Sequence, residues 1–209
     1  MIGFYNYTVI LTYLSLMISV GGLFFAAEGR IDPALLCLMA SGFLDLFDGM
    51  VARTKKDRTD DQKAFGIQID SLTDVICFGA LPALIAYETG LRAPYQIVIL
   101  MVFATCGMIR LGYYNVTEQH RQAATNEVRH AYCGLPITSS ALIIPFVYLF
   151  RDRMATQTFE IVLTVVMLTC AIAFITPICV KKPHGKSIAA LVVIGVVLAG
   201  LALIPRMVA

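Results

Sequence analysis

The sequence predicts an all-α protein, a polytopic membrane helical bundle with about seven transmembrane helices and a range of six to eight. The chain has 209 residues, of which 58% are hydrophobic and 14% charged, and its mean hydropathy is +0.78, far above soluble usage. The second observation is a series of apolar stretches near or above spanning length: residues 5–27, 33–51, 70–87, 95–113, 135–150, 159–180 and 188–204. Short connections between them predict one integral-membrane domain over residues 1–209.

The first stretch, residues 5–27, is expected to be a retained span rather than a signal peptide. No Lys or Arg precedes it, and it is longer than the apolar region of a typical signal peptide. Three later spans contain a proline, namely Pro82, Pro145 and Pro177. Neighbouring helices can satisfy the carbonyls that proline leaves free, so we expect kinks rather than breaks.

Lys and Arg are distributed unevenly between the two ends of the predicted bundle. The connections after the second, fourth and sixth spans carry Arg53, Lys55, Lys56, Arg58, Lys63, Arg110, Arg121, Arg129, Lys181, Lys182 and Lys186. The opposite side carries Arg30, Arg92, Arg151, Arg153 and Arg206. Because basic loops stay on the cytoplasmic side, we expect the N-terminus and the even connections to face the cytoplasm. The charged run 55–63 is expected to be a solvated loop or short interfacial helix beside anionic lipid.

Four aspartates occur where the second span ends and the third begins: Asp45, Asp48, Asp70 and Asp74. A carboxylate at bilayer depth costs about 2.5 to 3.5 kcal/mol on insertion scales, so a compensating role is expected. The members of each pair are three or four positions apart, which places them on one helical face. Two facing helices can therefore present all four carboxylates to one point near the cytoplasmic surface.

Carboxylate oxygens around one point suit hard divalent cations, and two such ions are the usual clamp for phosphoryl chemistry. The residues around the acids fit that use. Gly49, Ala52 and Gly66 leave room for a ligand or a second backbone. Arg53 can bind a phosphate at the edge of the site.

The four aspartates also allow other interpretations. A membrane aspartate can serve helix packing or proton relay, and an acidic pair at the membrane edge can simply be solvated. A cation transporter would use such acids, but no inverted repeat is visible and all the acids gather at one end. An aspartyl intramembrane protease needs only two acids, which leaves the second pair, Gly49 and Arg53 without a role.

The arrangement resembles a known signature. Residues 45–53, DLFDGMVAR, and 66–74, GIQIDSLTD, are similar to the motif D-x-x-D-G-x-x-A-R, spacer, G-x-x-x-D-x-x-x-D of the CDP-alcohol phosphatidyltransferases, with every specified position present. The spacer 54–65 is longer than is usual in that family. The resemblance implies that Asp45, Asp48, Asp70 and Asp74 bind two divalent metals, Mg²⁺ or Mn²⁺. It also implies a CDP-diacylglycerol site comprising Asp45, Asp48, Gly49, Ala52, Arg53, Gly66 and Asp70.

A narrower resemblance points to the phosphatidylserine synthase branch of this family. Residues 70–83, DSLTDVICFGALPA, are similar to the segment D-S-x-x-D-x-x-x-F-G-x-x-P-A of that branch, and residues 110–116 and 134–136 resemble two later segments. The resemblance implies CDP-diacylglycerol and L-serine as substrates, phosphatidylserine and CMP as products, and a homodimer. Glycerol 3-phosphate or an inositol phosphate are the alternative acceptors. Asp74 would be the catalytic base that accepts the serine hydroxyl proton.

Serine also requires a partner for its carboxylate. Arg110, at the cytoplasmic end of the fourth span, offers a bidentate guanidinium and is followed by Tyr113, Tyr114 and Asn115. The alternative is that Arg110 only extends to the membrane surface, with the tyrosines in an interfacial belt. No nucleic-acid partner is expected.

Overall fold

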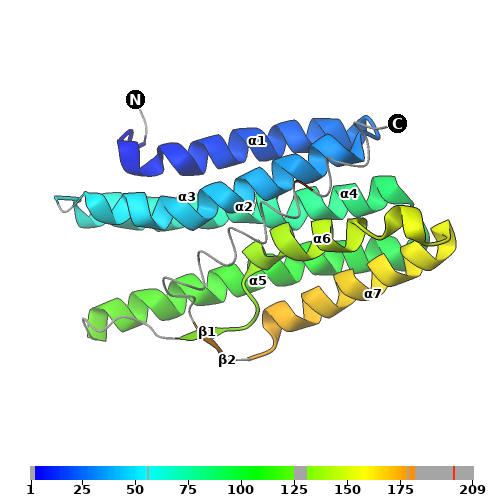
Figure 1. The fold of residues 1–209 in the computed structure, drawn as a ribbon. Coiled ribbons are helices and arrows are strands. Elements are labelled where there is room, and N and C mark those ends of the chain that lie inside the picture. The colour runs from blue at the N-terminus through cyan, green and yellow to red at the C-terminus, as the bar shows by residue number, and fades with distance from the viewer. Residues whose placement is uncertain (1–2, 56, 125–130, 178, 182–199, 201–209) are drawn as a thin grey trace.

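Long helices that run side by side make up most of the chain (Figure 1). The structure, a computed structural model, describes residues 3–55, 57–124, 131–177, 179–181 and 200. Its elements are η1 (Tyr7–Val9), α1 (Ile10–Ala27), α2 (Ile31–Thr54), α3 (Asp60–Asp74), η2 (Val75–Ala80), α4 (Leu81–Thr89), α5 (Pro94–Ala124), β1 (Ala131–Cys133), η3 (Ile137–Ser139), α6 (Ser140–Tyr148), η4 (Arg151–Arg153), α7 (Thr156–Ile175) and β2 (Cys179–Lys181).

The helices α1 and α2 form the most extensive contact in the described bundle. Small and hydroxyl-bearing residues allow their backbones to approach closely. A side chain at Gly22 would meet the Cβ of Cys37 at 2.8 Å, and the Ser19 and Ser41 hydroxyls lie 2.7 Å apart in a hydrogen bond. This close packing fixes the axis of α2, which carries the first pair of acids.

The third long helical segment begins earlier than the sequence predicted. The expectation was a span starting at residue 70, but α3 begins at Asp60. Thr59 caps it, because its side-chain oxygen accepts a hydrogen bond from the Gln62 amide at 3.3 Å, and the acidic residues of the first turn favour a helix N-terminus. Part of the charged run 55–63 is therefore the first turn of a long helix.

The same segment continues through a π-helix, η2, directly after Asp74, and then through α4. π-Helical turns inside α-helices are uncommon and are frequent at functional sites. The amide of Leu81 bonds the carbonyl of Ile76, five residues back. Pro82 follows at the beginning of α4.

Of the other two prolines, one lies inside a helix and the other does not. Pro145 lies inside α6, as predicted. Pro177 lies beyond the end of α7 at Ile175, so its predicted place within a span was wrong. The backbone at Thr176 is already extended, with ψ of 132°, as expected for a residue before proline.

α5, α6 and α7 form the second half of the bundle, with α5 packed along α7. Gly134 has a φ of +81°, and a side chain there would collide with the carbonyl oxygen of Phe174. The next residue, Leu135, donates its amide to the Ala173 carbonyl at 3.0 Å. The short strands β1 and β2 pair antiparallel beside this turn, with Ala131 opposite Lys181.

Five helical segments are long and apolar enough to cross a membrane: Tyr7–Ala27, Ile31–Ala52, Asp60–Thr89, Pro94–Glu118 and Thr156–Ile175. They confirm the predicted class, an all-α polytopic membrane bundle. The predicted fifth span is represented by the shorter helix α6 with η3 before it. The predicted span 188–204 lies outside the described residues, so the total of seven stays a prediction.

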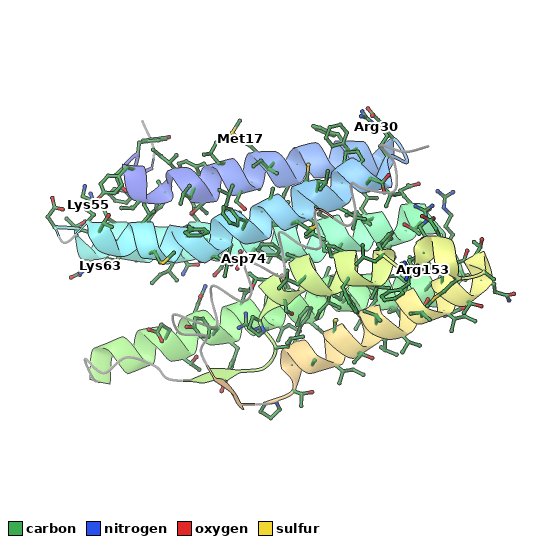
Figure 2. All side chains as sticks on the ribbon, viewed as in Figure 1. Met17, Arg30, Lys55, Lys63, Asp74 and Arg153 are labelled. Carbon is green, nitrogen blue, oxygen red and sulfur yellow. The ribbon has the colours of Figure 1, made fainter. Side chains whose placement is uncertain are left out.

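The two ends of the bundle are clearly separated (Figure 2). Lys55 and Lys63 lie at one end, Arg30 and Arg153 at the other, and Asp74 lies between them. The apolar core contains large side chains that are fully buried, among them Phe78 and Leu81, which follow Asp74 in the chain, and Phe103 of α5. Asp74 therefore lies between the two charged ends, directly before a segment whose large apolar side chains are packed in the core.

Candidate active site

Three of the four predicted acids meet at one point between α2 and α3. Asp45, Asp70 and Asp74 each offer a carboxylate oxygen, and these oxygens all lie within 4.8 Å of one another. The Asp74 residue is only 8% exposed, while Asp45 and Asp70 are half-buried. The helical spacing on α3 produces this arrangement, because residues 70 and 74 lie one turn apart on the same face.

Asp48, the fourth acid, lies at the edge of this cluster. It is half-buried, and its carboxyl interacts with that of Asp70. It also has a partner on α1, since the Thr12 hydroxyl donates to Asp48 Oδ2 at 3.5 Å. α1 thus contributes a polar contact to a site whose acids come from α2 and α3.

The donor set fits a hard divalent cation. Several half-buried or buried carboxylates at this separation repel one another, and removal from water makes their charges costly unless a positive charge lies among them. Oxygen-only ligands of this kind are those that Mg²⁺ and Mn²⁺ prefer. The carboxylates of Asp45, Asp70 and Asp74 could hold one ion, and Asp48 beside Asp70 extends the set.

The small residues of the signature leave open surface. A Cβ added at Gly49 would meet nothing within 4 Å in the described structure, and Gly49 is exposed. At Gly66 the nearest atom would be Arg58 Nη1, at 3.8 Å. Ala52 is half-buried on α2. Arg53 belongs to α2, but its side chain lies outside the described part of the structure.

The long spacer 54–65 divides into two parts. α2 ends at Thr54 and α3 starts at Asp60, so the second part of the spacer is helical. The Tyr7 hydroxyl lies 3.0 Å from Thr54 Oγ1, and the Phe4 and Phe65 rings are 5.3 Å apart in an edge-on contact. The N-terminal segment therefore packs against both ends of this connection.

Arg110 reaches the acids from α5. It is 8% exposed, and its guanidinium is close enough to Asp45 for the two charges to interact. Its guanidinium carbon lies 5.8 Å from the centre of the Tyr114 ring. This burial disagrees with the alternative in which Arg110 only extends to the membrane surface.

Two polar residues, Thr12 and Ser71, were given no role of their own by the sequence, whereas Asn115 was named there among the residues that follow Arg110. The Asn115 amide on α5 donates to Ser71 Oγ on α3 at 2.8 Å. Ser71 carries a signal, because it lies between two aspartates of the motif. Thr12 carries none, because threonine is ordinary within apolar spans, where its hydroxyl commonly bonds its own helix.

Comparison with known proteins adds independent information. The model of the CDP-alcohol phosphatidyltransferase family matches residues 5–177. A Saccharomyces cerevisiae protein named CDP-diacylglycerol–serine O-phosphatidyltransferase is 34% identical over 110 residues, covering 51% of this chain and 38% of the relative. A Methanothermobacter thermautotrophicus protein named archaetidylserine synthase is 30% identical over 160 residues, covering 75% of this chain and 61% of the relative.

A third relative is covered more completely. The CDP-diacylglycerol–serine O-phosphatidyltransferase of Bacillus subtilis is 29% identical over 163 residues, which cover 77% of this chain and 80% of the relative. The yeast and archaeal relatives, in contrast, are matched over less than two thirds of their own length. The matched region in this chain includes both pairs of acids.

Proposed function

Because the chain belongs to the CDP-alcohol phosphatidyltransferase family, we propose that it transfers the phosphatidyl group of CDP-diacylglycerol to the hydroxyl of L-serine, giving phosphatidylserine and CMP. The observation that carries this proposal is the meeting of the Asp45, Asp70 and Asp74 carboxylates within 4.8 Å. The names of all three relatives refer to serine or a serine lipid. That agreement favours serine over glycerol 3-phosphate or an inositol phosphate as the acceptor.

The four aspartates would hold two divalent ions, Mg²⁺ or Mn²⁺. When bound, the ions supply positive charge to the pyrophosphate oxygens and to the leaving phosphate. The open surface at Gly49 gives the CDP-diacylglycerol headgroup space to approach the acids, and Ala52 and Gly66 are proposed to belong to the same binding site. Arg53 is proposed to bind a phosphate oxygen.

Two side chains of the protein would accept the proton of the acceptor and hold the acceptor in position. As the serine hydroxyl oxygen forms its bond to phosphorus, the phosphorus–oxygen bond to CMP breaks, and Asp74 accepts the hydroxyl proton. Asp74 is buried and lies one helical turn from Asp70 on α3. Arg110, buried and close to Asp45, would pair with the serine carboxylate and place the hydroxyl beside Asp74.

The position of the acids in the bundle also suggests where the lipid substrate lies in the membrane. The lipid tails would stay in the bilayer while the headgroup reacts at the end of the bundle that carries Lys55 and Lys63. We propose that this end and the N-terminus face the cytoplasm, because the basic connections lie there. The active form is proposed to be a homodimer in the cell membrane.

An acceptor screen with CMP release as the readout tests the proposal. Purified protein with CDP-diacylglycerol and Mg²⁺ or Mn²⁺ should release CMP when L-serine is added, and release should stop in EDTA. Glycerol 3-phosphate and inositol phosphate are the comparison acceptors. Equal release with either of them, or undiminished release in EDTA, would overturn the proposed function.

A further inference from the structure

A cavity of about 340 Å³ lies at the end of the bundle away from Lys55 and Lys63. It forms where the end of α4 meets the connection from α6 to α7, which Arg153 marks in Figure 2. Its volume falls within the range of small-molecule sites, about 300 to 1,000 Å³. None of its lining residues belongs to the acid cluster. They are Thr89, Arg151, Asp152, Met154, Thr156 and Phe159.

Two opposite charges line the cavity without pairing. Arg151 is half-buried and Asp152 is exposed, and among the described residues neither forms an ion pair. Arg92, three residues after Thr89, differs because Glu88 pairs with it at 2.7 Å. The cavity therefore offers both a guanidinium and a carboxylate to a molecule that carries both signs of charge.

The hydroxyl and amide groups of the lining add an acceptor and several donors. The single hydroxyl hydrogen of Thr89 is used within the protein, because Thr89 Oγ1 lies 2.7 Å from the Ile85 carbonyl and 2.5 Å from the Tyr148 hydroxyl. Toward a ligand, Thr89 can therefore only accept. α7 begins at Thr156, and Ala155 provides no side-chain cap. The amide hydrogens of this first turn are therefore available to an anion.

The cavity lies at the depth where two membrane spans end. Thr89 is the last residue of the candidate span Asp60–Thr89, and Thr156 is the first residue of Thr156–Ile175. Farther along α7, the apolar side chains of Ile161 and Val165 are 56% and 57% exposed on one face. In a membrane such side chains face lipid tails, so the headgroups of the same lipids lie at the level of the cavity.

We propose that this cavity binds the headgroup of an amine-bearing, zwitterionic phospholipid in the leaflet at the Arg153 end of the bundle. Arg151 and the first turn of α7 would hold the phosphodiester through charge-assisted hydrogen bonds. Asp152 and the Thr89 oxygen would accept hydrogen bonds from the ammonium group. Phosphatidylethanolamine has this headgroup. The cavity is separate from the acid cluster, so the proposal does not depend on the proposed function.

Lipid binding to the purified full chain, measured by native mass spectrometry after removal of lipid in detergent, tests the proposal. Phosphatidylethanolamine should bind in a saturable manner. Arg151→Gln should weaken this binding about tenfold or more, the change expected for loss of a hydrogen bond from a charged group. Arg153→Gln is the matched control, because it removes the same charge from an exposed neighbour that does not line the cavity. Unchanged binding in Arg151→Gln, or equal weakening in both variants, would overturn the proposal.

The carboxylate of Asp152 predicts a preference for the amine. Phosphatidylglycerol carries the phosphodiester but no ammonium group, so the wild type should bind it more weakly than phosphatidylethanolamine. Asp152→Asn should abolish this preference by weakening the binding of phosphatidylethanolamine alone. A preference that persists in Asp152→Asn would overturn the assignment to an amine-bearing lipid.

Inorganic phosphate and phosphoethanolamine separate a membrane lipid from a soluble phosphate compound. Neither carries acyl chains, so neither should displace phosphatidylethanolamine at concentrations similar to that of the lipid. Displacement by either one would assign the cavity to a soluble ligand and refute lipid binding. The lipid-free unfolding temperature shows whether each variant folds. If Arg151→Gln does not fold, Arg151→Lys takes its place, because it keeps the charge but loses the guanidinium geometry, and it should also weaken lipid binding.

Discussion

The Ser140 hydroxyl on α6 donates a hydrogen bond to the backbone carbonyl of Phe78, 3.1 Å away in the π-helix that follows Asp74. In a regular helix this carbonyl would bond the amide of the residue four positions later, which is Pro82. Proline has no amide hydrogen. Because water cannot satisfy a carbonyl deep in a membrane bundle, the Ser140 hydroxyl contributes a side-chain donor where the amide of residue 82 cannot. A serine distant in the sequence thus stabilises the segment beneath the acids.

Removing this donor should destabilise the protein. Ser140→Ala removes a buried hydrogen bond from the Phe78 carbonyl, and we expect a loss of about 0.5 to 1.5 kcal/mol, seen as a lower unfolding temperature in detergent. The Pro82→Ala background is the sharpest control, because alanine at this position would restore an amide donor and should reduce the effect of Ser140→Ala. An equal loss in both backgrounds would contradict this explanation.

Thr12 should influence the affinity for the divalent ion through Asp48. Thr12→Val keeps the shape of the side chain but removes the hydroxyl that donates to Asp48 Oδ2. Loss of such a supporting contact costs about tenfold in metal affinity at the low end of its range, so half-maximal CMP release should require correspondingly more Mg²⁺ or Mn²⁺. Thr105→Val is the matched control, because Thr105 is exposed on α5 and its hydroxyl bonds its own helix at the Met101 carbonyl. An unchanged metal requirement would show that Asp48 is held without Thr12.

Arg110→Lys tests the proposed contact with the serine carboxylate. Lysine keeps the charge but loses the two-pronged geometry of the guanidinium. A hydrogen bond to a charged group contributes about 1.5 to 3 kcal/mol, so the KM for serine should rise by about tenfold or more. The KM for CDP-diacylglycerol should change little. A serine KM equal to that of the wild type would remove Arg110 from this role.

Much of the fold followed from the sequence because apolar length is a direct requirement of the bilayer. The spacing of Asp70 and Asp74 likewise implied one helical face, and the two carboxylates do meet. The start of the third helix at Asp60 was missed because the prediction used apolar length, whereas a Thr59 cap and acidic first turn extend the helix into a charged stretch.

Contacts between distant segments could not be predicted. The sequence showed Pro82 but not the π-helix before it or its donor, Ser140. Arg110 was a candidate by residue type, yet its approach to Asp45 depends on how α5 packs against α3 and η2. The same packing brings Asn115 to Ser71. Single-sequence patterns carry periodicity within a helix but no information on the register between helices.

The proposed orientation predicts opposite labelling of the two ends of the bundle. Asp57 and Asp152 are both exposed, and they lie in the connections near Lys55 and Arg153, which mark the two ends in Figure 2. With a membrane-impermeant maleimide, Asp57→Cys should react only in inside-out vesicles and Asp152→Cys only in right-side-out vesicles. The unmodified chain gives the background from its own cysteines. Reaction of both variants from the same side would contradict the predicted topology.

Asp70 is the acid whose replacement should be most damaging, because it lies within the carboxylate cluster and also interacts with Asp48. Asp70→Asn keeps the size of the side chain but removes the negative charge and weakens the oxygen ligand that a hard cation prefers. We expect CMP release with serine to fall to background, with normal yield and unfolding temperature. Asp61→Asn, at an exposed acid in the first turn of the same helix, should retain activity. Normal turnover by Asp70→Asn would exclude that carboxylate from the reaction.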